Sequence, residues 1–229
     1  MPSSKGNASD AFVQAVRDAE DSQSTELNFT HNYELKTIPQ EIKLLRPFLQ
    51  ILHIDNCFEL KTLHPGIGDL ILLRWLNVSY NQLQSLPPEI AKLRNLERLH
   101  VNNNAITTIP TEFWGLKNLE EFKVESNRIR ALPTGIVFLP KLREVQLENN
   151  PLITKKEIEG AEVATMFPAT NGGDCSNCNI RFRSAQLFLT FHDLPHSKDV
   201  PVVNYVCSEA CKTHTLKRLA ACDAQVKEV

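Results

Sequence analysis

LRWLNVSYNQLQSLP, the segment from Leu73 to Pro87, recurs three times in the sequence that follows it. The later copies are LERLHVNNNAITTIP from Leu96, LEEFKVESNRIRALP from Leu119 and LREVQLENNPL from Leu142. All four fit the pattern L-x-x-L-x-L-x-x-N-x-L when other apolar residues are allowed at the Leu positions. The second apolar positions, Leu76, Leu99, Phe122 and Val145, follow one another at intervals of 23 residues. A fixed period of this length indicates a solenoid built from stacked units.

Two further units lie upstream, LNFTHNYELKTIP at Leu27 and LHIDNCFELKTLH at Leu52, and each carries one extra residue before its next Leu. The six units together resemble the leucine-rich repeat family, in the short form whose units end in Leu-Pro. The resemblance covers about Leu27 to Leu152. It implies an α/β fold, a solenoid whose six repeats form a curved parallel sheet.

Alternation within each unit predicts a short strand with two buried residues, such as Leu76 and Val78. We interpret the Asn of each unit as structural, because its side chain can bond free backbone groups where the chain leaves the strand. These residues are Asn81, Asn104, Asn127 and Asn150. Cys57 takes the Asn position in the second unit. Segments such as PPEIAKL then return along the convex side.

The repeat pattern also divides the chain into regions. We expect a disordered start and an N-terminal capping helix in residues 1–24, with disorder in residues 1–8. Phe12 and Val16 lie four residues apart in DAFVQAVRDAE, which predicts a helix from Asp10 to Glu20 with Asp10 as its N-cap. Repeats are expected in residues 25–155, a linker in residues 156–174 and a cysteine-rich module in residues 175–229.

The residues beside the buried strand positions are expected on the open, concave face, in columns that cross the strands. The first column holds Glu26, Ile51, Trp75, Arg98, Glu121 and Glu144, and the second holds Asn28, His53, Asn77, His100, Lys123 and Gln146. The third holds Thr30, Asp55, Ser79, Asn102, Glu125 and Glu148, and the fourth holds His31, Asn56, Tyr80, Asn103, Ser126 and Asn149.

The columns differ in character along the array. Units five and six carry an acidic set, Glu120, Glu121, Glu125, Glu144 and Glu148, whereas aromatic, His and Arg residues gather on units two to four. Trp, Tyr and Arg dominate the binding energy of protein interfaces. We therefore predict a protein-binding site at Ile51, His53, Trp75, Tyr80, Arg98, His100 and Lys123, with basic groups of the partner near the acidic set. The alternative is that Trp75 only packs on its neighbours.

Two cysteine pairs follow the repeats, at Cys175 and Cys178 and at Cys207 and Cys211. Pairs at this spacing suit a tetrahedral zinc ion. Leu187 to Phe191 and Val200 to Val206 alternate in the manner of strands. The run from Lys212 to Ala224 predicts a helix. A cysteine knuckle, a hairpin and a second pair at a helix start predict a small treble-clef-like zinc module.

Other readings of this module stay open. Four buried thiols are the alternative to zinc, although a module of this size rarely folds without a staple. The module could also serve only to seal the last repeat. Arg181, Arg183, Lys212, Lys217 and Arg218 make it locally basic, so nucleic-acid binding is a weaker alternative.

The segment from Cys175 to Cys211, with its VPVVNYVCSEAC, also resembles the C-terminal part of the family of leucine-rich repeat-containing protein 58. That resemblance implies an intracellular adaptor, or a substrate receptor of a cullin-type ubiquitin ligase that binds ligase subunits.

Composition narrows the class of protein further. Hydrophobic residues make up 42% of the chain, which is enough for a packed core. The net charge is −2, so the chain as a whole lacks the strongly basic character of nucleic-acid-binding proteins. A polar start and the lack of any long apolar stretch predict a cytoplasmic or nuclear protein without membrane contact. No G-x-S-x-G, P-loop or H-E-x-x-H motif occurs, so we expect no enzyme activity.

Overall fold

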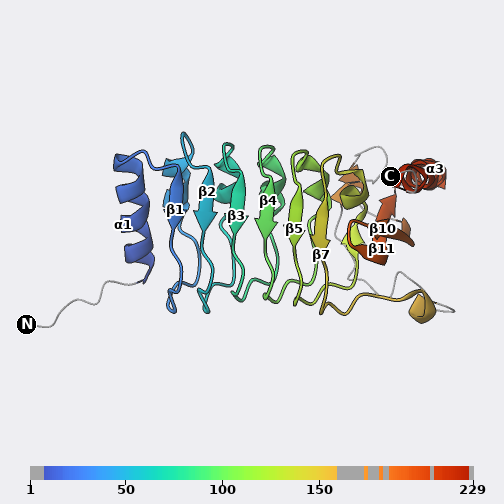
Figure 1. Cartoon of the computed structure of the whole chain (residues 1–229), viewed down its shortest axis with the longest axis horizontal. Helices are drawn as coiled ribbons and strands as arrows, with labels where there is room; N and C mark the ends of the chain where they lie inside the picture. Colours follow the sequence, from blue (N-terminus) through green and yellow to red (C-terminus); the bar gives the residue numbers. More distant parts are fainter. Residues whose placement is uncertain (1–7, 159–172, 175–180, 183–185, 207–208, 227–229) are drawn as a thin grey trace, which may run out of the picture.

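The computed structural model describes residues 8–158, 173–174, 181–182, 186–206 and 209–226. Strands stand side by side in a row, with a helix at one end and a hairpin and second helix at the other (Figure 1). The strand face, as we call the open face of this row, is lined by the residues that flank each buried strand centre. The opposite, convex side carries short 3-10 helices.

Six strands form one parallel sheet in chain order: β1 (Glu26–Asn28), β2 (Ile51–His53), β3 (Trp75–Asn77), β4 (Arg98–His100), β5 (Glu121–Lys123) and β7 (Glu144–Gln146). The pairing places Trp75 opposite Ile51 on one side and opposite Arg98 on the other. This is the register predicted from the repeat, so the six-unit solenoid is confirmed.

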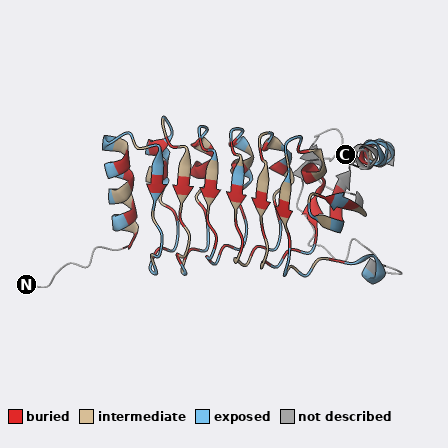
Figure 2. Ribbon diagram, in the orientation of Figure 1, coloured by how far each residue is buried: buried red, intermediate tan, exposed pale blue. Residues whose placement is uncertain are grey.

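The core runs through the array because the central residue of every strand is apolar and buried (Figure 2). One continuous cluster extends from Phe12 in the first helix to Val145 in β7. A single three-residue strand cannot bury its apolar side chain, whereas stacked units cover one another. The repeat is therefore stable only as an array.

The Asn of each unit forms the predicted ladder. The Asn127 amide nitrogen donates to the carbonyl oxygens of Val101 and Val124, both at 3.0 Å, and its oxygen accepts from the Ile106 amide at 2.9 Å. Asn81, Asn104 and Asn150 make the corresponding bonds. In unit two, burial raises the pKa of the Cys57 thiol, and its sulfur lies 3.5 Å from the Phe29 carbonyl oxygen.

The return segments are short 3-10 helices: η1 (Gln40–Leu45), η2 (Pro65–Asp69), η3 (Pro88–Lys92), η4 (Thr111–Gly115) and η5 (Thr134–Phe138). Each places at least one large residue in the core, such as Ile90 in η3 and Phe113 in η4. Neighbouring helices pack closely, and glycine is required at some contacts because a Cβ atom there would overlap the next unit. A further 3-10 helix, η6 (Lys155–Ile158), follows the last strand of the sheet.

Helix α1 (Ala8–Asp21) covers the first unit. Phe12 and Val16 are fully buried, and the Phe12 ring meets the Phe29 ring edge-on with centroids 4.9 Å apart. Asp10 lies within the first turn of the helix and not at its N-cap, because the helix already includes Ala8. Residues 1–7, most of the stretch predicted to be disordered, lie outside the described residues.

A hairpin covers the other end of the array. Strands β10 (Gln186–Leu194) and β11 (Ser197–Val206) pair antiparallel, and β11 also pairs in parallel with the short strand β6 (Leu132–Pro133). Leu194 and Val200 join the core of the array. Helix α3 (Glu209–Val226) contacts the hairpin and η5. The hairpin therefore extends the solenoid instead of standing apart from it.

A buried polar cluster holds the hairpin to η5. The Thr134 hydroxyl lies 2.8 Å from both the Val203 carbonyl oxygen and the Asn204 side-chain oxygen. The Asn204 amide nitrogen donates to the Thr190 hydroxyl at 2.9 Å, and a His192 ring nitrogen lies 2.8 Å from the same hydroxyl. Buried polar groups are costly unless they are bonded, so these bonds favour one docking position.

Candidate functional site

Four side chains of the strand face form a stack, which we call the Trp75 cluster: His53, Trp75, Arg98 and His100. The His53 and His100 rings meet the Trp75 ring edge-on from neighbouring strands, with centroids at 4.5 and 5.8 Å. The Arg98 guanidinium carbon lies 4.2 Å from the Trp75 ring centroid, a cation–π contact. Ile51, also half-buried, faces Trp75 from β2. The structure thus brings together five of the seven predicted partner-binding residues.

The Trp75 ring is fixed by its neighbours, but its N–H group lacks a hydrogen-bond acceptor among the described residues. Its Nε1 atom is buried and has no hydrogen-bond partner within the described residues. Indole N–H groups usually find a partner when buried. The stack therefore holds a large aromatic side chain in place, at some cost in free energy from its unpaired N–H group.

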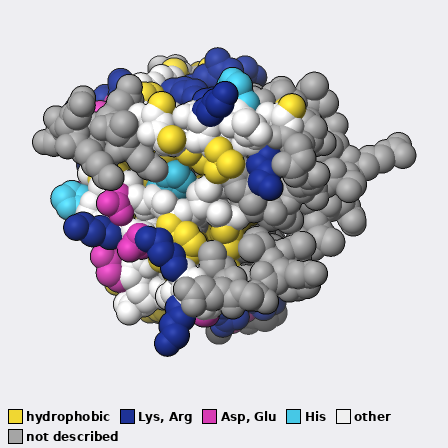
Figure 3. All heavy atoms as spheres, turned by 90° about the vertical axis from the view of Figure 1, so that its right-hand side faces the viewer, with side chains coloured by type: hydrophobic (Ala, Val, Ile, Leu, Met, Phe, Trp, Pro, Cys, Tyr) yellow, Lys and Arg dark blue, Asp and Glu magenta, His cyan; other side chains and the backbone are white. Residues whose placement is uncertain are grey.

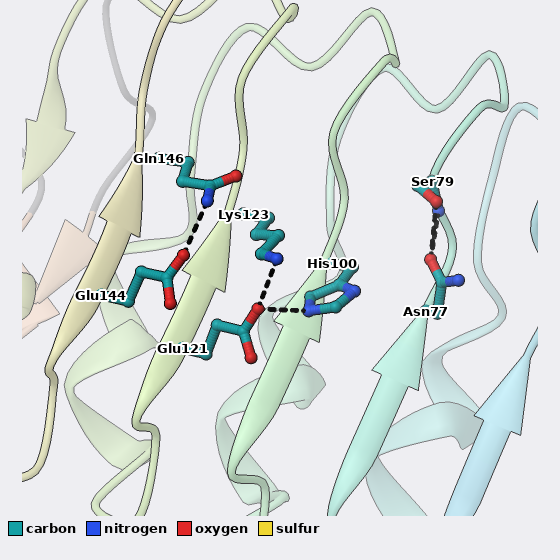
Figure 4. A network of polar contacts seen from close by, with 7 residues as sticks. All are labelled: Asn77, Ser79, His100, Glu121, Lys123, Glu144 and Gln146. Carbon is teal, nitrogen blue, oxygen red and sulfur yellow. Dashed lines mark hydrogen bonds and ion pairs between the residues drawn. The ribbon is translucent and has the colours of Figure 1, made fainter.

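A polar network lies beside the stack and contains the sixth predicted residue, Lys123 (Figure 4). The Glu121 carboxylate lies 2.7 Å from the Lys123 ammonium and 3.0 Å from a His100 ring nitrogen. Burial acts to raise the pKa of Glu121, but Lys123 and His100 outweigh it and the pKa is lowered. Burial lowers the pKa of His100, against the opposing pull of Glu121. Glu121 is thus already matched by positive charge.

Tyr80, the seventh predicted residue, lies at the corner after β3, and no contact joins it to Trp75 in the described structure. It is 48% exposed and its φ is 55°. The other units place His31, Asn56, Asn103, Ser126 and Asn149 at this corner, all with φ between 54° and 58°. The left-handed conformation is unfavourable for a bulky side chain, so Tyr80 adds strain that an Asn would reduce.

The third column differs from its prediction at two units. Ser79 and Asn102, expected to be exposed, are buried at 5% and 9% exposure. The Ser79 hydroxyl donates to the Asn77 side-chain oxygen at 2.7 Å, which turns it toward the sheet (Figure 4). Only the outer units of this column therefore offer side chains to a partner.

Three glutamates of units five and six form what we call the acidic patch: Glu125, Glu144 and Glu148. Burial raises the pKa of Glu125, and the charges of Glu148 and Glu144 add to this. One Glu125 oxygen is buried without a partner in the described residues. Two members of the predicted acidic set lie outside the patch: Glu121 is neutralised, and Glu120 lies 3.8 Å from Arg143.

We expect Glu125→Gln to raise the thermal midpoint at pH 7 and to have little effect near pH 4. The raised pKa means that the folded protein binds a proton more tightly than the unfolded chain, so stability falls as pH rises above the ordinary range of glutamate. Glutamine removes this loss. Melting curves from pH 4 to 8 test it, with the exposed Glu34→Gln as control. A constant difference across that range would contradict it.

The predicted metal ligands are incompletely described. Cys175, Cys178 and Cys207 lie outside the described residues, and Cys211 is partly exposed in the first turn of α3. Within the described ranges, no group of three or more His, Cys, Asp or Glu side chains is arranged to hold a metal.

The elements around these cysteines are described. Strands β8 (Gly173–Asp174) and β9 (Arg181–Phe182) pair antiparallel on either side of the first cysteine pair. Strand β11 ends one residue before Cys207, and β8 contacts β11. The strands that precede the two cysteine pairs are therefore neighbours.

Other surfaces escaped the sequence prediction. A hollow of about 680 Å³ lies on the convex side between η3 and η4 and is bordered by Trp114, which is 41% exposed. Tyr33 and Phe58 stack in parallel at 5.3 Å and are both exposed. The sequence does contain a signal for the exposure of Trp114. Its position in the repeat is occupied by the smaller residues Gly68, Ala91 and Val137 in other units.

The described Lys and Arg side chains of the C-terminal end do not form an uninterrupted basic field. In the view of Figure 3, described Lys and Arg side chains share the periphery with Asp and Glu. Arg218, one of the residues behind the nucleic-acid alternative, packs over the Phe138 ring at 4.4 Å. Within the part of the chain that is described, no helix is long and apolar enough to cross a membrane.

The family model for the leucine-rich repeat region matches residues 30–159, more than half of the chain. The chain therefore belongs to the leucine-rich repeat family. Domains of this family generally mediate protein–protein interaction and are typically non-enzymatic scaffolds. No curated protein matches the chain.

Several solved structures are similar to the array. The leucine-rich repeat protein LIC12759 of Leptospira interrogans shares 30% identity at a TM-score of 0.47, over 63% of this chain and 42% of that one. YopM from Yersinia enterocolitica shares 27% identity at 0.52, over 67% and 31%. The ectodomain of the Arabidopsis thaliana receptor kinase GASSHO1/SCHENGEN3, solved with CASPARIAN STRIP INTEGRITY FACTOR 2, shares 30% at 0.49, over 56% and 16%. The chain thus spans less than half the length of each.

Proposed function

We propose that this chain is a non-enzymatic adaptor that binds a partner protein on its strand face, through the Trp75 cluster. The observation that carries the proposal is the stack itself. Arg98, His53 and His100 hold a half-buried Trp in place before any partner arrives. Side chains that are already ordered lose little entropy on binding, which favours affinity.

We expect Trp75→Ala to reduce recovery of the specific partner at least about tenfold, since truncating a central aromatic hot spot costs about 2 kcal/mol or more. Affinity purification of the tagged full chain with quantitative proteomics measures this. Trp114→Ala is the matched control, because Trp114 is also partly exposed but lies on the convex side. Equal loss in both variants, or in neither, would contradict the proposal.

The same purification separates the adaptor from a more specific candidate. Cullin-type ligase subunits bound equally to the wild-type and Trp75→Ala chains would favour a ubiquitin-ligase substrate receptor. That reading rests on the resemblance of the segment from Cys175 to Cys211, and no described contact adds to it.

We further propose that Cys175, Cys178, Cys207 and Cys211 bind one zinc ion. The contact between β8 and β11 supports this, because each of these strands leads into a cysteine pair. Zinc would act structurally here, as a closed site of four thiolates. Such thiols persist in reducing compartments, so we place the chain in the cytoplasm or nucleus.

Zinc content of the purified chain, measured by elemental mass spectrometry, tests this proposal. We expect about one zinc ion per chain, lost in Cys178→Ser and retained in Cys57→Ser, because Cys57 is buried in the array away from the module. A zinc-free wild-type chain purified without chelators would refute it. Retention in the Cys178→Ser variant would show that the ligand set is wrong.

A further inference from the structure

On units four to six, the strand face carries a positive end, Arg98, and a negative end, Glu125 and Glu148, and this polarity defines the chemistry of a partner. We propose that the bound segment is an extended stretch of protein that presents a carboxylate to Arg98 and a Lys or Arg side chain to Glu125 and Glu148. This inference rests on the proposed function, because it describes the partner of the same face.

Arg98 is prepared for a carboxylate. Its guanidinium is held over Trp75, yet the residue is exposed, and none of the ion pairs within the described residues includes it. Glu121 faces Arg98 in the strand register, but its carboxylate is bound to Lys123 and His100. A guanidinium above an aromatic ring keeps its N–H donors in its own plane and can bind a carboxylate through two parallel hydrogen bonds.

The acidic patch is suited to a cation. Glu125 follows β5 and Glu148 follows β7, and the two segments lie side by side, because the Ser126 amide donates to the Glu148 carbonyl oxygen at 2.8 Å. Glu125 has a buried oxygen without a donor, and Lys123, the nearest cation of that strand, is bound to Glu121. A Lys or Arg of the partner beside Glu125 and Glu148 would add positive charge and relieve the repulsion between the two carboxylates.

The register gives the distance between the two ends. Glu125 lies one strand across from Arg98, which is about 5 Å, and four residues further along, which is about 13 Å. The direct separation is therefore about 14 Å, or about four residues of an extended chain. The network of His100, Glu121 and Lys123 (Figure 4) lies between the two ends by the strand register, and its paired charges repel neither end.

A random 12-residue peptide library displayed on phage, selected on the immobilised full chain, tests the proposal. We expect peptides with an acidic and a basic residue about four positions apart to be enriched about fivefold or more over the unselected library. The Arg98→Glu/Glu125→Lys/Glu148→Lys variant reverses both ends of the face. It is expected to select pairs in which the acidic and basic residues have exchanged places relative to the flanking aromatic or apolar positions.

Three comparisons make the outcome decisive. A convex-side swap, Lys92→Glu/Glu112→Lys, is expected to select the same peptides as the wild type. Selection of identical peptides by the wild type and the strand-face swap would overturn the charge assignment. If the Trp75→Ala variant selects the same peptides as the wild type, the proposed function fails as well. If the wild type selects peptides without a charge pair, and the Trp75→Ala variant does not select them, the further inference alone is overturned.

Discussion

Replacing Gly68 by alanine is expected to lower the free energy of unfolding by about 2 to 3 kcal/mol. Gly68 lies in η2 of unit two, where the chain passes close to η3 of unit three. A Cβ atom at Gly68 would lie 2.9 Å from the carbonyl carbon of Glu89, and closer still to its oxygen. Backbone atoms of a packed unit cannot rotate away, so the two units must separate.

Gly66→Ala is the matched control for this prediction, since it makes the same change two residues away. Its Cβ would meet Lys43 Cε at 2.6 Å and His64 Nδ1 at 2.8 Å, and both belong to side chains that can move. We expect it to cost less than about 1 kcal/mol. Urea unfolding of the two variants measures the difference, and similar costs would show that close packing of η2 and η3 is not what requires the glycine.

Replacing Asn127 by alanine is expected to cost about 3 kcal/mol, because it removes all bonds of one step of the ladder. The Ile106 amide would lose its side-chain acceptor, and the carbonyl oxygens of Val101 and Val124 would each lose one of two side-chain donors, keeping those of Asn104 and Asn150. A buried polar group left unpaired costs about 1 to 3 kcal/mol, and these groups are partly rescued by water or by relaxation.

Asn118→Ala provides the control, with the same substitution in the same region of the array. Asn118 is only half-buried and donates one bond, to the Arg94 carbonyl oxygen at 2.7 Å. We expect its removal to cost about 0.5 to 1 kcal/mol. Hydrogen exchange locates the effect: Asn127→Ala should speed exchange in units four and five. If Asn127→Ala and Asn118→Ala lower the free energy of unfolding equally, the Asn ladder contributes no more to stability than a single side-chain hydrogen bond.

The array could be predicted in detail from the repeat. A period of 23 residues with an Asn at a fixed place predicts the strand, its buried centre and its corner, because every unit solves the same local packing problem. The columns of the strand face followed from the same register, and the pairing of Trp75 with Ile51 and Arg98 confirms it. The separation of Tyr80 from the Trp75 cluster was not predicted. The repeat register gives the order of the residues on the strand face, but not the direction in which a side chain points where the chain turns after the strand.

The interactions that no repeat encodes depended on tertiary structure. Glu121 belongs to the acidic set in the sequence, but the Lys123 ammonium pairs with its carboxylate and the His100 ring contacts it, because the adjacent strands β4 and β5 bring these side chains together. The hairpin was predicted as part of a module after the repeats, and its place on β6, held by the bond between Thr134 and Asn204, depends on residues 70 positions apart. The local sequence pattern predicts which side chains of a segment are buried. The surface on which the segment packs is formed by residues far away in the sequence, so the contact is defined only in the folded chain.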